Sequence, residues 1–174
     1  MKVSIIAAMD QKRGIGKDNK IPWRIKEDLI HLKNLTTGHV VILGRKSYDS
    51  MVFYYNKTGN PMPGRLYIVV TRDKNYKPAR ENARIAHSLE KALSFARGRL
   101  AKLHLTKLDE VFVIGGAQIF QQAIATADKL YLTIVEGDFD ADTFFPDYSE
   151  FKKVVHEETR ESNEYRFKFL ELEK

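Results

Sequence analysis

The chain has 174 residues, of which 43% are hydrophobic and 30% charged, and it contains no cysteine. This composition is typical of one globular domain and excludes disulfides and thiolate metal sites. The formal charge of +6 and the pI of about 9.4 favour an anionic partner, but no basic run alternates with aromatic residues as a nucleic-acid platform requires. We therefore expect a single domain over residues 1–174 that binds neither nucleic acid nor a membrane.

Strands and helices are predicted to alternate along most of the chain. Short apolar runs predict buried strands at residues 3–9, 39–44, 65–71, 83–87, 110–116 and 129–137. Apolar residues spaced three and four apart predict a helix that begins within residues 21–34 and continues to Thr36. The same spacing predicts helices at residues 45–51, 88–100 and 117–127, the second of these with Ser88 as its N-cap. The segment 52–64, which contains two prolines and two glycines, predicts an irregular loop.

Two segments with alternating polarity close the chain, residues 151–160 and 164–174, and predict an antiparallel hairpin. In the last segment the apolar residues change phase after Phe169, which indicates either a bulge there or a strand buried on both faces. The order of elements predicts an α/β fold with a mostly parallel central sheet of about eight strands, this C-terminal hairpin and about four flanking helices. Such a sheet binds ligands at the carboxyl ends of its strands.

One acidic residue lies where the first helix pattern expects an apolar side chain. Wound at about 100° per residue, that helix has an apolar stripe formed by Ile25, Leu29, Leu32 and Leu35. Asp28 falls inside the stripe, where a carboxylate is costly unless something pairs with it. Two interpretations stay open: an acid at a half-solvated helix end that favours the dipole, or a carboxylate that belongs to a binding site.

Three segments that follow predicted strands have features of phosphate-binding loops. Gly44 precedes Arg45, Lys46 and Ser47 at one helix start, and Gly115-Gly116 precedes another, where free N–H groups can bind an anion. Thr71-Arg72 is the third, and guanidinium groups such as those of Arg45 and Arg72 suit a terminal phosphate monoester. Together they indicate a dinucleotide or another polyanion. No complete G-x-G-x-x-G, Walker A pattern, nucleophile elbow or metal-site spacing is present.

Eight motifs follow one another in order: IIAAMD, GIG, IPWRIKEDL, VILGRKSY, PMPGR, VFVIGGAQIF, KLYLT and DADTFFP. With them the chain resembles the dihydrofolate reductase family over nearly its whole length. The resemblance implies NADPH-dependent reduction of 7,8-dihydrofolate to 5,6,7,8-tetrahydrofolate, with a hydride transferred to C6 and a proton to N5. It also suggests that antifolates such as methotrexate or trimethoprim bind. We expect a cytoplasmic monomer with no metal.

The resemblance implies a set of substrate-binding residues. The carboxylate of Asp28 accepts hydrogen bonds from the 2-amino and N3 groups of the pterin ring, and Thr133 supports it from a strand. Arg65 binds the α-carboxylate of the glutamate tail. The other residues implied on this side are Ile6, Ala8, Leu29, Leu32 and Met51. We expect burial to raise the pKa of Asp28 by more than the helix N-terminus lowers it, and the proton to reach N5 through water near Ile21 and Trp23.

The resemblance also implies a set of residues that bind NADPH. They are Ala7, Ile15, Gly16 and Phe120 beside the nicotinamide, Gly44, Arg45, Lys46 and Ser47 at the cofactor phosphates, Thr71 and Arg72 at the adenosine 2′-phosphate, and Ile114, Gly115, Gly116, Ala117, Gln118 and Ile119 around the pyrophosphate. Gly115 and Gly116 are implied to be joined by a cis peptide bond. Residues 14–23 are implied to form a mobile loop over the nicotinamide, held by Asp142.

The chain departs from the family pattern at several positions. Leu32, Tyr48 and Phe120 replace a frequent phenylalanine, tryptophan and tyrosine, and the segment 52–60 is longer than in compact bacterial members. Two other functions remain open. One is a related reductase of a phosphoribosylated aminopyrimidine in flavin biosynthesis, against which Asp28 and Arg65 count. The other is a non-enzymatic nucleotide-binding module, which would not need an acid in the apolar stripe.

Overall fold

Strands and helices alternate along the computed structural model, which describes residues 1–63, 66–103, 109–162 and 164–174. The strands are β1 (Lys2–Asp10), β2 (Gly14–Gly16), β3 (Val40–Gly44), β4 (Leu66–Val70), β5 (Ala83–Ala86), β6 (Glu110–Val113), β7 (Lys129–Val135), β8 (Thr143–Phe144), β9 (Lys153–Glu161) and β10 (Arg166–Glu173). The helices are α1 (Lys26–Thr36), α2 (Arg45–Thr58), α3 (Leu89–Leu103) and α4 (Ala117–Ala123).

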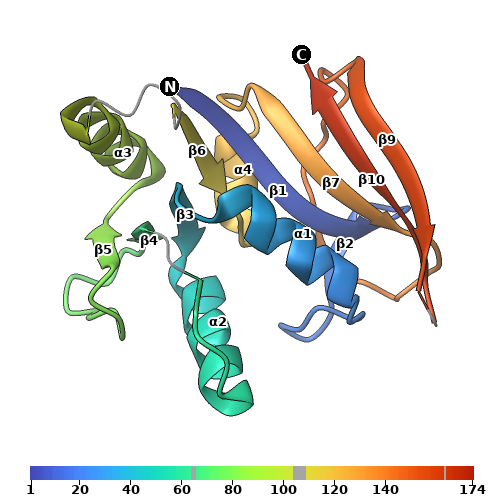
Figure 1. Cartoon of the computed structure of the whole chain (residues 1–174), viewed down its shortest axis with the longest axis horizontal. Helices are drawn as coiled ribbons and strands as arrows, with labels where there is room; N and C mark the ends of the chain where they lie inside the picture. The colour runs from blue at the N-terminus through green and yellow to red at the C-terminus, as the bar shows by residue number, and fades with distance from the viewer. Residues whose placement is uncertain (64–65, 104–108, 163) are drawn as a thin grey trace.

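Eight of these strands form one twisted sheet in the order β5-β4-β3-β6-β1-β7-β10-β9 (Figure 1). The pairs from β5 to β7 are parallel, and β10 is antiparallel to both β7 and β9. The apolar strands of the interior carry helices on both faces, as a parallel sheet requires. The predicted fold class, including the closing hairpin, is therefore confirmed.

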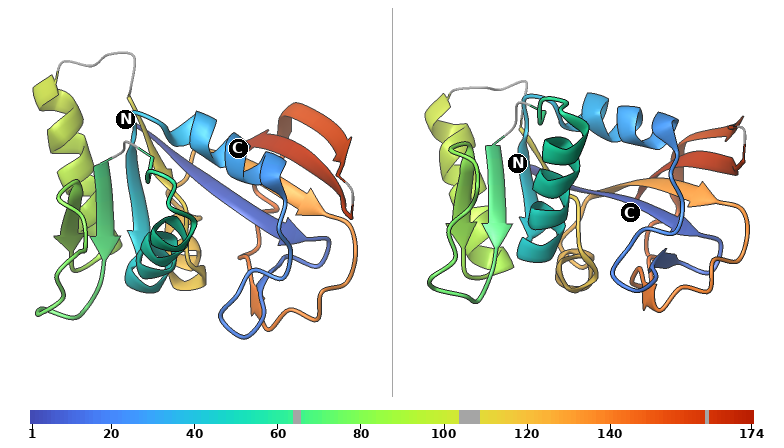
Figure 2. Two further views of the ribbon diagram at one scale, coloured as in Figure 1. Left: turned by 60° about the horizontal axis from the view of Figure 1, so that its bottom comes forward. Right: turned by 90° about the horizontal axis from the view of Figure 1, so that it is seen from below.

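The two faces of the sheet have different helices and separate cores. Helices α1 and α2 lie on one face, and α3 and α4 on the other (Figure 2). Because side chains alternate along a strand, β1 contributes to both cores. Ile5 and Ala7 pack on the side of α3 and α4, and Ile6 packs on the side of α2. Neighbouring residues of one strand can thus line two different parts of a binding site.

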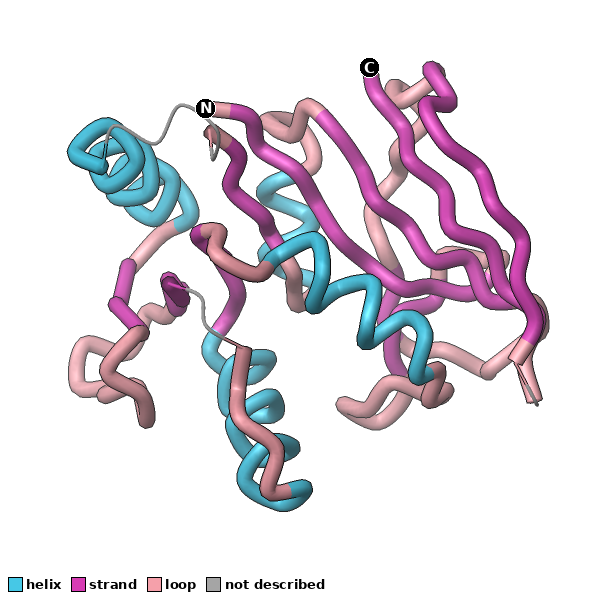
Figure 3. The backbone as a smooth tube through the Cα atoms, in the orientation of Figure 1, coloured by secondary structure: helices cyan, strands magenta, loops and turns pink. Residues whose placement is uncertain are grey.

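A second, two-stranded sheet ties the loop after β1 to the loop after β7, and the two loops lie side by side (Figure 3). The buried carboxylate of Asp10 accepts the N–H groups of Lys12 at 2.8 Å and Gly14 at 2.7 Å. A Cβ at Gly14 would lie 2.5 Å from Asp10 Oδ2, so only glycine fits this turn. The sequence pattern did not predict this small sheet, because each of its strands is only two or three residues long.

The prediction of a short second helix followed by a loop from residue 52 was wrong. Helix α2 continues to Thr58, and Gly59 ends it with a left-handed φ of 68°, a common helix terminator. Tyr48 and Val52 are buried and Met51 is partly buried, so the apolar spacing of three and four residues continues beyond residue 51. The first proline after Met51 is Pro61, which leaves the helix free to extend.

Details at two other elements agree with the predicted pattern. The hydroxyl of Ser88 accepts the N–H of Lys91 at 3.1 Å, which is the expected N-cap of α3. In β10, Phe167 and Phe169 belong to one core cluster and Leu172 to another, so the strand is buried on both faces. The register between β9 and β10 also shifts, between Glu171 and Leu172 rather than near Phe169.

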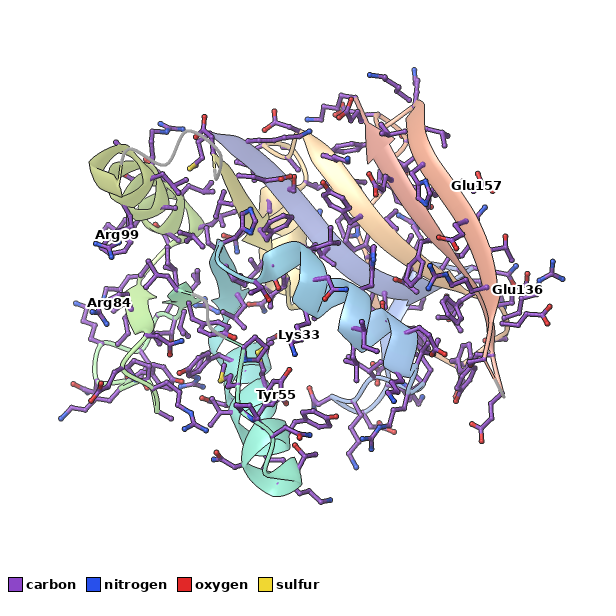
Figure 4. All side chains as sticks on the ribbon, in the orientation of Figure 1. Lys33, Tyr55, Arg84, Arg99, Glu136 and Glu157 are labelled. Atoms are coloured by element: carbon purple, nitrogen blue, oxygen red, sulfur yellow. The ribbon has the colours of Figure 1, made fainter. Side chains whose placement is uncertain are left out.

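Charged side chains lie at both edges of the sheet. Arg84 and Arg99 lie at the β5 and α3 edge, whereas Glu136 and Glu157 lie at the opposite edge, near β9 (Figure 4). Among the described residues, no helix has the length and apolar character needed to span a membrane.

Candidate active site

The three predicted phosphate-binding segments meet at one edge of the sheet. They follow β3, β4 and β6, which are adjacent parallel strands, so their carboxyl ends lie side by side. The N–H of Gly44 donates to the carbonyl of Gly115 at 2.7 Å, and Gly44 is in register with Val70 at the end of β4. This edge is the place where sheets of this kind bind ligands.

Glycines allow the backbone of this edge to pack closely. A Cβ at Gly116 would lie 3.2 Å from Ser47 Oγ, and one at Gly44 would lie 3.3 Å from Ile119 Cγ1. Gly115 has a φ of 114°, and the Gly115–Gly116 peptide bond is cis, as the resemblance implied. Within the described chain, no side chain caps the starts of α2 or α4. The N–H groups at the start of the longer helix, α2, are therefore available to an anion.

Cationic side chains surround the same edge. The guanidinium of Arg45 is half-buried and its Nη1 lies 3.2 Å from Asp73 Oδ2, whereas Lys46 and Arg72 are exposed. Thr71 is buried: its hydroxyl accepts the N–H of Asp73 at 3.2 Å. Two helix starts, these cations and the glycines form what we call the cofactor side of the site. It matches the chemistry of a ligand with several phosphates.

Asp28 lies in the first turn of α1 and points to the sheet. The hydroxyl of Thr133 donates to Asp28 Oδ1 at 2.6 Å. Thr133 is buried on β7, in register with Ala8 of β1 and Phe169 of β10. Burial raises the pKa of the Asp28 carboxyl, and the hydrogen bond from Thr133 lowers it by less. Of the two interpretations of this acid, the contact with the sheet favours the carboxylate of a binding site.

Apolar residues around Asp28 form what we call the substrate side. Ile6 is buried in the same cluster that Leu32 and Met51 pack against, while the Leu29 side chain is 42% exposed. Ile21 is 65% exposed at the start of this region. An acid with one hydroxyl partner among apolar groups is suited to a ligand that offers further N–H donors.

Trp23 contributes an unusual polar group beside this region. Its ring is buried against Phe139, at a centroid distance of 5.0 Å, and it belongs to the cluster that contains Ile25 and Phe167. The indole Nε1 is buried and has no hydrogen-bond partner within the described residues. Because buried donors are normally paired, Nε1 is a candidate for contact with a ligand or a water molecule.

The predicted nicotinamide-side residues come together on the other face of β1. Ala7 and Phe120 are buried in one cluster, and Ile15 packs against it. Gly16 lies in β2, and its carbonyl accepts the N–H of Asp142 at 3.0 Å. The Asp142 carboxylate in turn accepts the N–H of Asp18 at 2.9 Å. The acidic turn thus contacts the loop of residues 14–23, as the resemblance implied.

The remaining predicted residues have varied positions. Ile119 is buried, Ile114 and Ala117 are partly buried, and Gln118 is exposed. Arg65 lies outside the described residues. No group of three or more His, Cys, Asp or Glu side chains in the described part of the chain could hold a metal ion.

Sequence reasoning missed some side chains on the substrate side. Met62 packs against the same cluster as Met51, and Arg24 lies over the Tyr54 ring, 5.6 Å from its centroid. Met62 stands inside the PMPGR motif and could have been found there, whereas nothing in the spacing links Arg24 to Tyr54. Two open cavities, of about 460 and 280 Å³, include neither Asp28 nor Thr133, although Met62 lines the larger of the two. The site is therefore defined by its contacts.

Comparisons with known proteins give a consistent result. The sequence pattern of the family described as dihydrofolate reductase matches residues 2–174. The chain is 39% identical to a dihydrofolate reductase of Staphylococcus haemolyticus over 173 residues, covering 97% of this chain and 93% of that protein. It is 36% identical to one from Bacillus subtilis over 178 aligned residues, covering 99% and 94%.

A solved structure is similar as well. It is a dihydrofolate reductase from Enterococcus faecalis in complex with NADP(H) and RAB-propyl. The TM-score is 0.78 at 29% sequence identity, and the match covers 99% of this chain and 95% of that one.

Proposed function

The chain belongs to the dihydrofolate reductase family, and on that premise we propose that Asp28 is the residue that binds and orients the pterin ring of its substrate. The reaction is the NADPH-dependent reduction of 7,8-dihydrofolate to 5,6,7,8-tetrahydrofolate. When bound, NADPH supplies the hydride that C6 of the substrate receives, and N5 takes up a proton. The chain's own residues must align the two rings and keep bulk water away.

The observation that carries this proposal is the 2.6 Å hydrogen bond from Thr133 to the desolvated carboxyl of Asp28. That bond engages Oδ1 and leaves acceptor positions for the 2-amino and N3–H groups of the ring. Because the carboxylate is buried, each charge-assisted hydrogen bond to it is stronger than in water. Ile6, Ala8, Leu29, Leu32 and Met51 would supply the apolar contacts to the ring and the benzoyl group.

Proton delivery is proposed to use water held between Ile21 and Trp23. The buried, unpartnered Nε1 of Trp23 supports this role, since it can donate a hydrogen bond to such a water. Ile21 is exposed and would shield the water from bulk solvent when substrate is bound. Asp28 would set the electrostatic potential around N5 rather than transfer the proton itself.

NADPH is proposed to bind along the cofactor side. The N–H groups at the start of α2, from Arg45 to Ser47, and the glycine pair would hold the pyrophosphate, with Ile114 and residues 117–119 beside it. The close approach of Gly44, Gly115 and Gly116 to their neighbours supports this fit. Thr71 and Arg72 would contact the 2′-phosphate. Ala7, Ile15, Gly16 and Phe120 would contact the nicotinamide, and Asp142 would hold the covering loop.

Some predictions extend beyond the described contacts. Arg65 would bind the glutamate α-carboxylate of folate, and antifolates such as methotrexate or trimethoprim would compete for the Asp28 carboxylate. A monomeric state and a cytoplasmic location also stay predictions. The pyrimidine reductase and the non-enzymatic module are not favoured by the family match.

The test is an assay of NADPH oxidation with and without dihydrofolate, run on the wild type and on Asp28→Asn. We expect oxidation that depends on dihydrofolate in the wild type and a large loss in the variant, with NADP⁺ affinity retained. Methotrexate should inhibit the wild type strongly. Oxidation driven by an aminopyrimidine ribose phosphate but not by dihydrofolate would contradict the proposal.

A further inference from the structure

Arg45 is held from two sides by residues that follow β4. Its Nη1 lies 3.2 Å from Asp73 Oδ2, and its guanidinium carbon lies 5.8 Å from the centre of the Tyr76 ring. Asp73 is itself fixed, because its carboxylate accepts the N–H of Asn75 at 2.9 Å. No other partner of the Arg45 guanidinium is present among the residues that the structure describes, so its Nε and Nη2 groups are available to a ligand.

The Tyr76 ring is fixed in turn by α2. Its hydroxyl donates to Asp49 Oδ1 at 2.5 Å, across 27 residues of sequence. Asp49 lies four residues after Arg45, so the two side chains emerge from the same face of the helix one turn apart. Burial and the neighbouring Asp49 carboxylate both raise the pKa of the Tyr76 hydroxyl, which therefore remains a protonated donor at neutral pH.

We propose that Tyr76 and Asp49 are positioning residues that hold Arg45 at the adenosine 2′-phosphate of the cofactor and thereby set the preference for NADPH over NADH. The inference rests on the proposed NADPH site. It adds that the Arg45 guanidinium binds the 2′-phosphate beside Thr71 and Arg72, while the Arg45 main-chain N–H lies at the pyrophosphate. A long arginine side chain loses rotamer freedom when it binds phosphate. A ring that already supports the guanidinium reduces this loss, so the phosphate-bearing cofactor gains affinity.

The charges around Arg45 make the effect specific for the phosphate. Lys46 and Arg72 add positive charge at the same edge, whereas the Asp73 carboxylate opposes an incoming phosphate and prevents Arg45 from turning away. Neither Tyr76 nor Asp49 is among the residues assigned to the nicotinamide, the pyrophosphate or the pterin ring. Loosening them should therefore change the affinity for the 2′-phosphate and leave the rest of the cofactor contact intact.

The test uses NADP⁺ and NAD⁺ as matched probes, because they differ only in the 2′-phosphate. Their dissociation constants are measured by calorimetry on the full chain for the wild type, Tyr76→Phe, Asp49→Asn and Arg45→Ala. Tyr76→Phe keeps the ring but removes the hydroxyl that Asp49 holds. We expect it to weaken NADP⁺ binding by about twofold, and by no more than the fivefold that corresponds to loss of a whole exposed cation–π contact, with NAD⁺ binding unchanged. Asp49→Asn keeps an acceptor for the tyrosine hydroxyl, so its loss of NADP⁺ affinity should be smaller than that of Tyr76→Phe.

A double variant shows whether Tyr76 acts through Arg45. If it does, Arg45→Ala/Tyr76→Phe should bind NADP⁺ with the same affinity as Arg45→Ala, because the guanidinium that Tyr76 holds is already absent. Additive losses, equal losses for both nucleotides, no effect of Tyr76→Phe or no effect of Arg45→Ala would each overturn the inference. Tyr148→Phe, which removes a tyrosine hydroxyl between β8 and β9, is the control and should change neither constant.

The same preparations are assayed for dihydrofolate reduction, which separates this inference from the proposed function. An active wild type whose Tyr76→Phe variant keeps its NADP⁺ affinity would overturn only the positioning role. A wild type that does not reduce dihydrofolate would contradict the proposed function, whatever the nucleotide affinities are.

Discussion

The substrate side and the cofactor side of the proposed site differ in the chemistry that each offers to a ligand. On the substrate side a single carboxylate, that of Asp28, lies among apolar side chains with Thr133 as its partner. On the cofactor side the main chain approaches closely at Gly44, Gly115 and Gly116, and cations lie at the exposed rim. One buried charge should account for most of the binding energy on the substrate side, whereas backbone conformation should determine binding on the cofactor side. Mutations on the substrate side should therefore reduce turnover, whereas mutations on the cofactor side should reduce stability and NADP⁺ affinity.

The largest effect is expected from Asp28→Asn. The variant keeps the shape of the side chain but loses the negative charge that we propose orients the pterin ring. We expect turnover with dihydrofolate to fall about a hundred- to a thousandfold, as for the loss of other preorganised electrostatic groups. NADP⁺ affinity, measured by calorimetry, should remain within about twofold because the cofactor side is untouched. Near-normal turnover at neutral pH would contradict the role of Asp28.

On the cofactor side, the largest effect is expected from a change that strains the backbone. At Gly115, φ is 114° and an added Cβ would lie 3.0 Å from Phe120 Cζ. Gly115→Ala should therefore destabilise the fold by about 2 kcal/mol and weaken NADP⁺ binding. The matched control is Gly98→Ala in α3, where an added Cβ meets nothing within 4 Å. That change should stabilise the protein by about 0.5–1 kcal/mol, and equal unfolding midpoints for the two variants would count against this account.

Thr133 offers a finer test of the substrate side. Thr133→Val removes the donor that lowers the pKa of Asp28, so that pKa should rise further. A larger fraction of Asp28 is then protonated at a given pH, and dihydrofolate binding should weaken at a higher pH than in the wild type. We expect the loss in kcat/KM near neutral pH to be about tenfold, the order for a hydrogen bond to a charged group. Thr133→Ser keeps the hydroxyl, so its kcat/KM should depend on pH as that of the wild type does.

The smallest expected effect is that of Asp28→Asn on the stability of the fold. The variant should gain stability although it loses activity. The folded state raises the pKa of Asp28, so it disfavours the ionised form relative to the unfolded chain. Stability should therefore fall as the pH rises from the ordinary aspartate pKa through the raised one. Asp28→Asn removes that cost and should stabilise the protein at neutral pH by on the order of 1 kcal/mol. Thermal unfolding at several pH values would show this gain disappear in acid, where Asp28 is protonated in both states.

The two sides also differ in how well the sequence predicts them. Glycines and cations that directly follow apolar strands marked three segments, and these segments meet because adjacent parallel strands bring their carboxyl ends to one edge. The helical position of Asp28 indicated a site but not its partner. That contact joins residues 105 positions apart, and only the resemblance pointed to Thr133.

Other features depended on contacts that no local pattern reveals. The hydrogen bond between Tyr76 and Asp49 and the pairing of β2 with β8 both join segments far apart in the chain. Helix α2 is a different case: its apolar spacing continues to Val52 and beyond, but the glycines and prolines after Thr58 suggested an earlier end. Local composition outweighed periodicity in that prediction, and packing against the sheet decided the outcome.

The most direct test of the substrate side is a carbon-13 NMR titration of the Asp28 carboxyl, assigned by its absence from the spectrum of Asp28→Asn. We predict that in the free protein the group titrates above the ordinary aspartate range. With a pterin ligand that donates two N–H groups, its pKa should fall. An ordinary aspartate pKa that the ligand leaves unchanged would contradict the account, because it would place the carboxylate in solvent and outside the site.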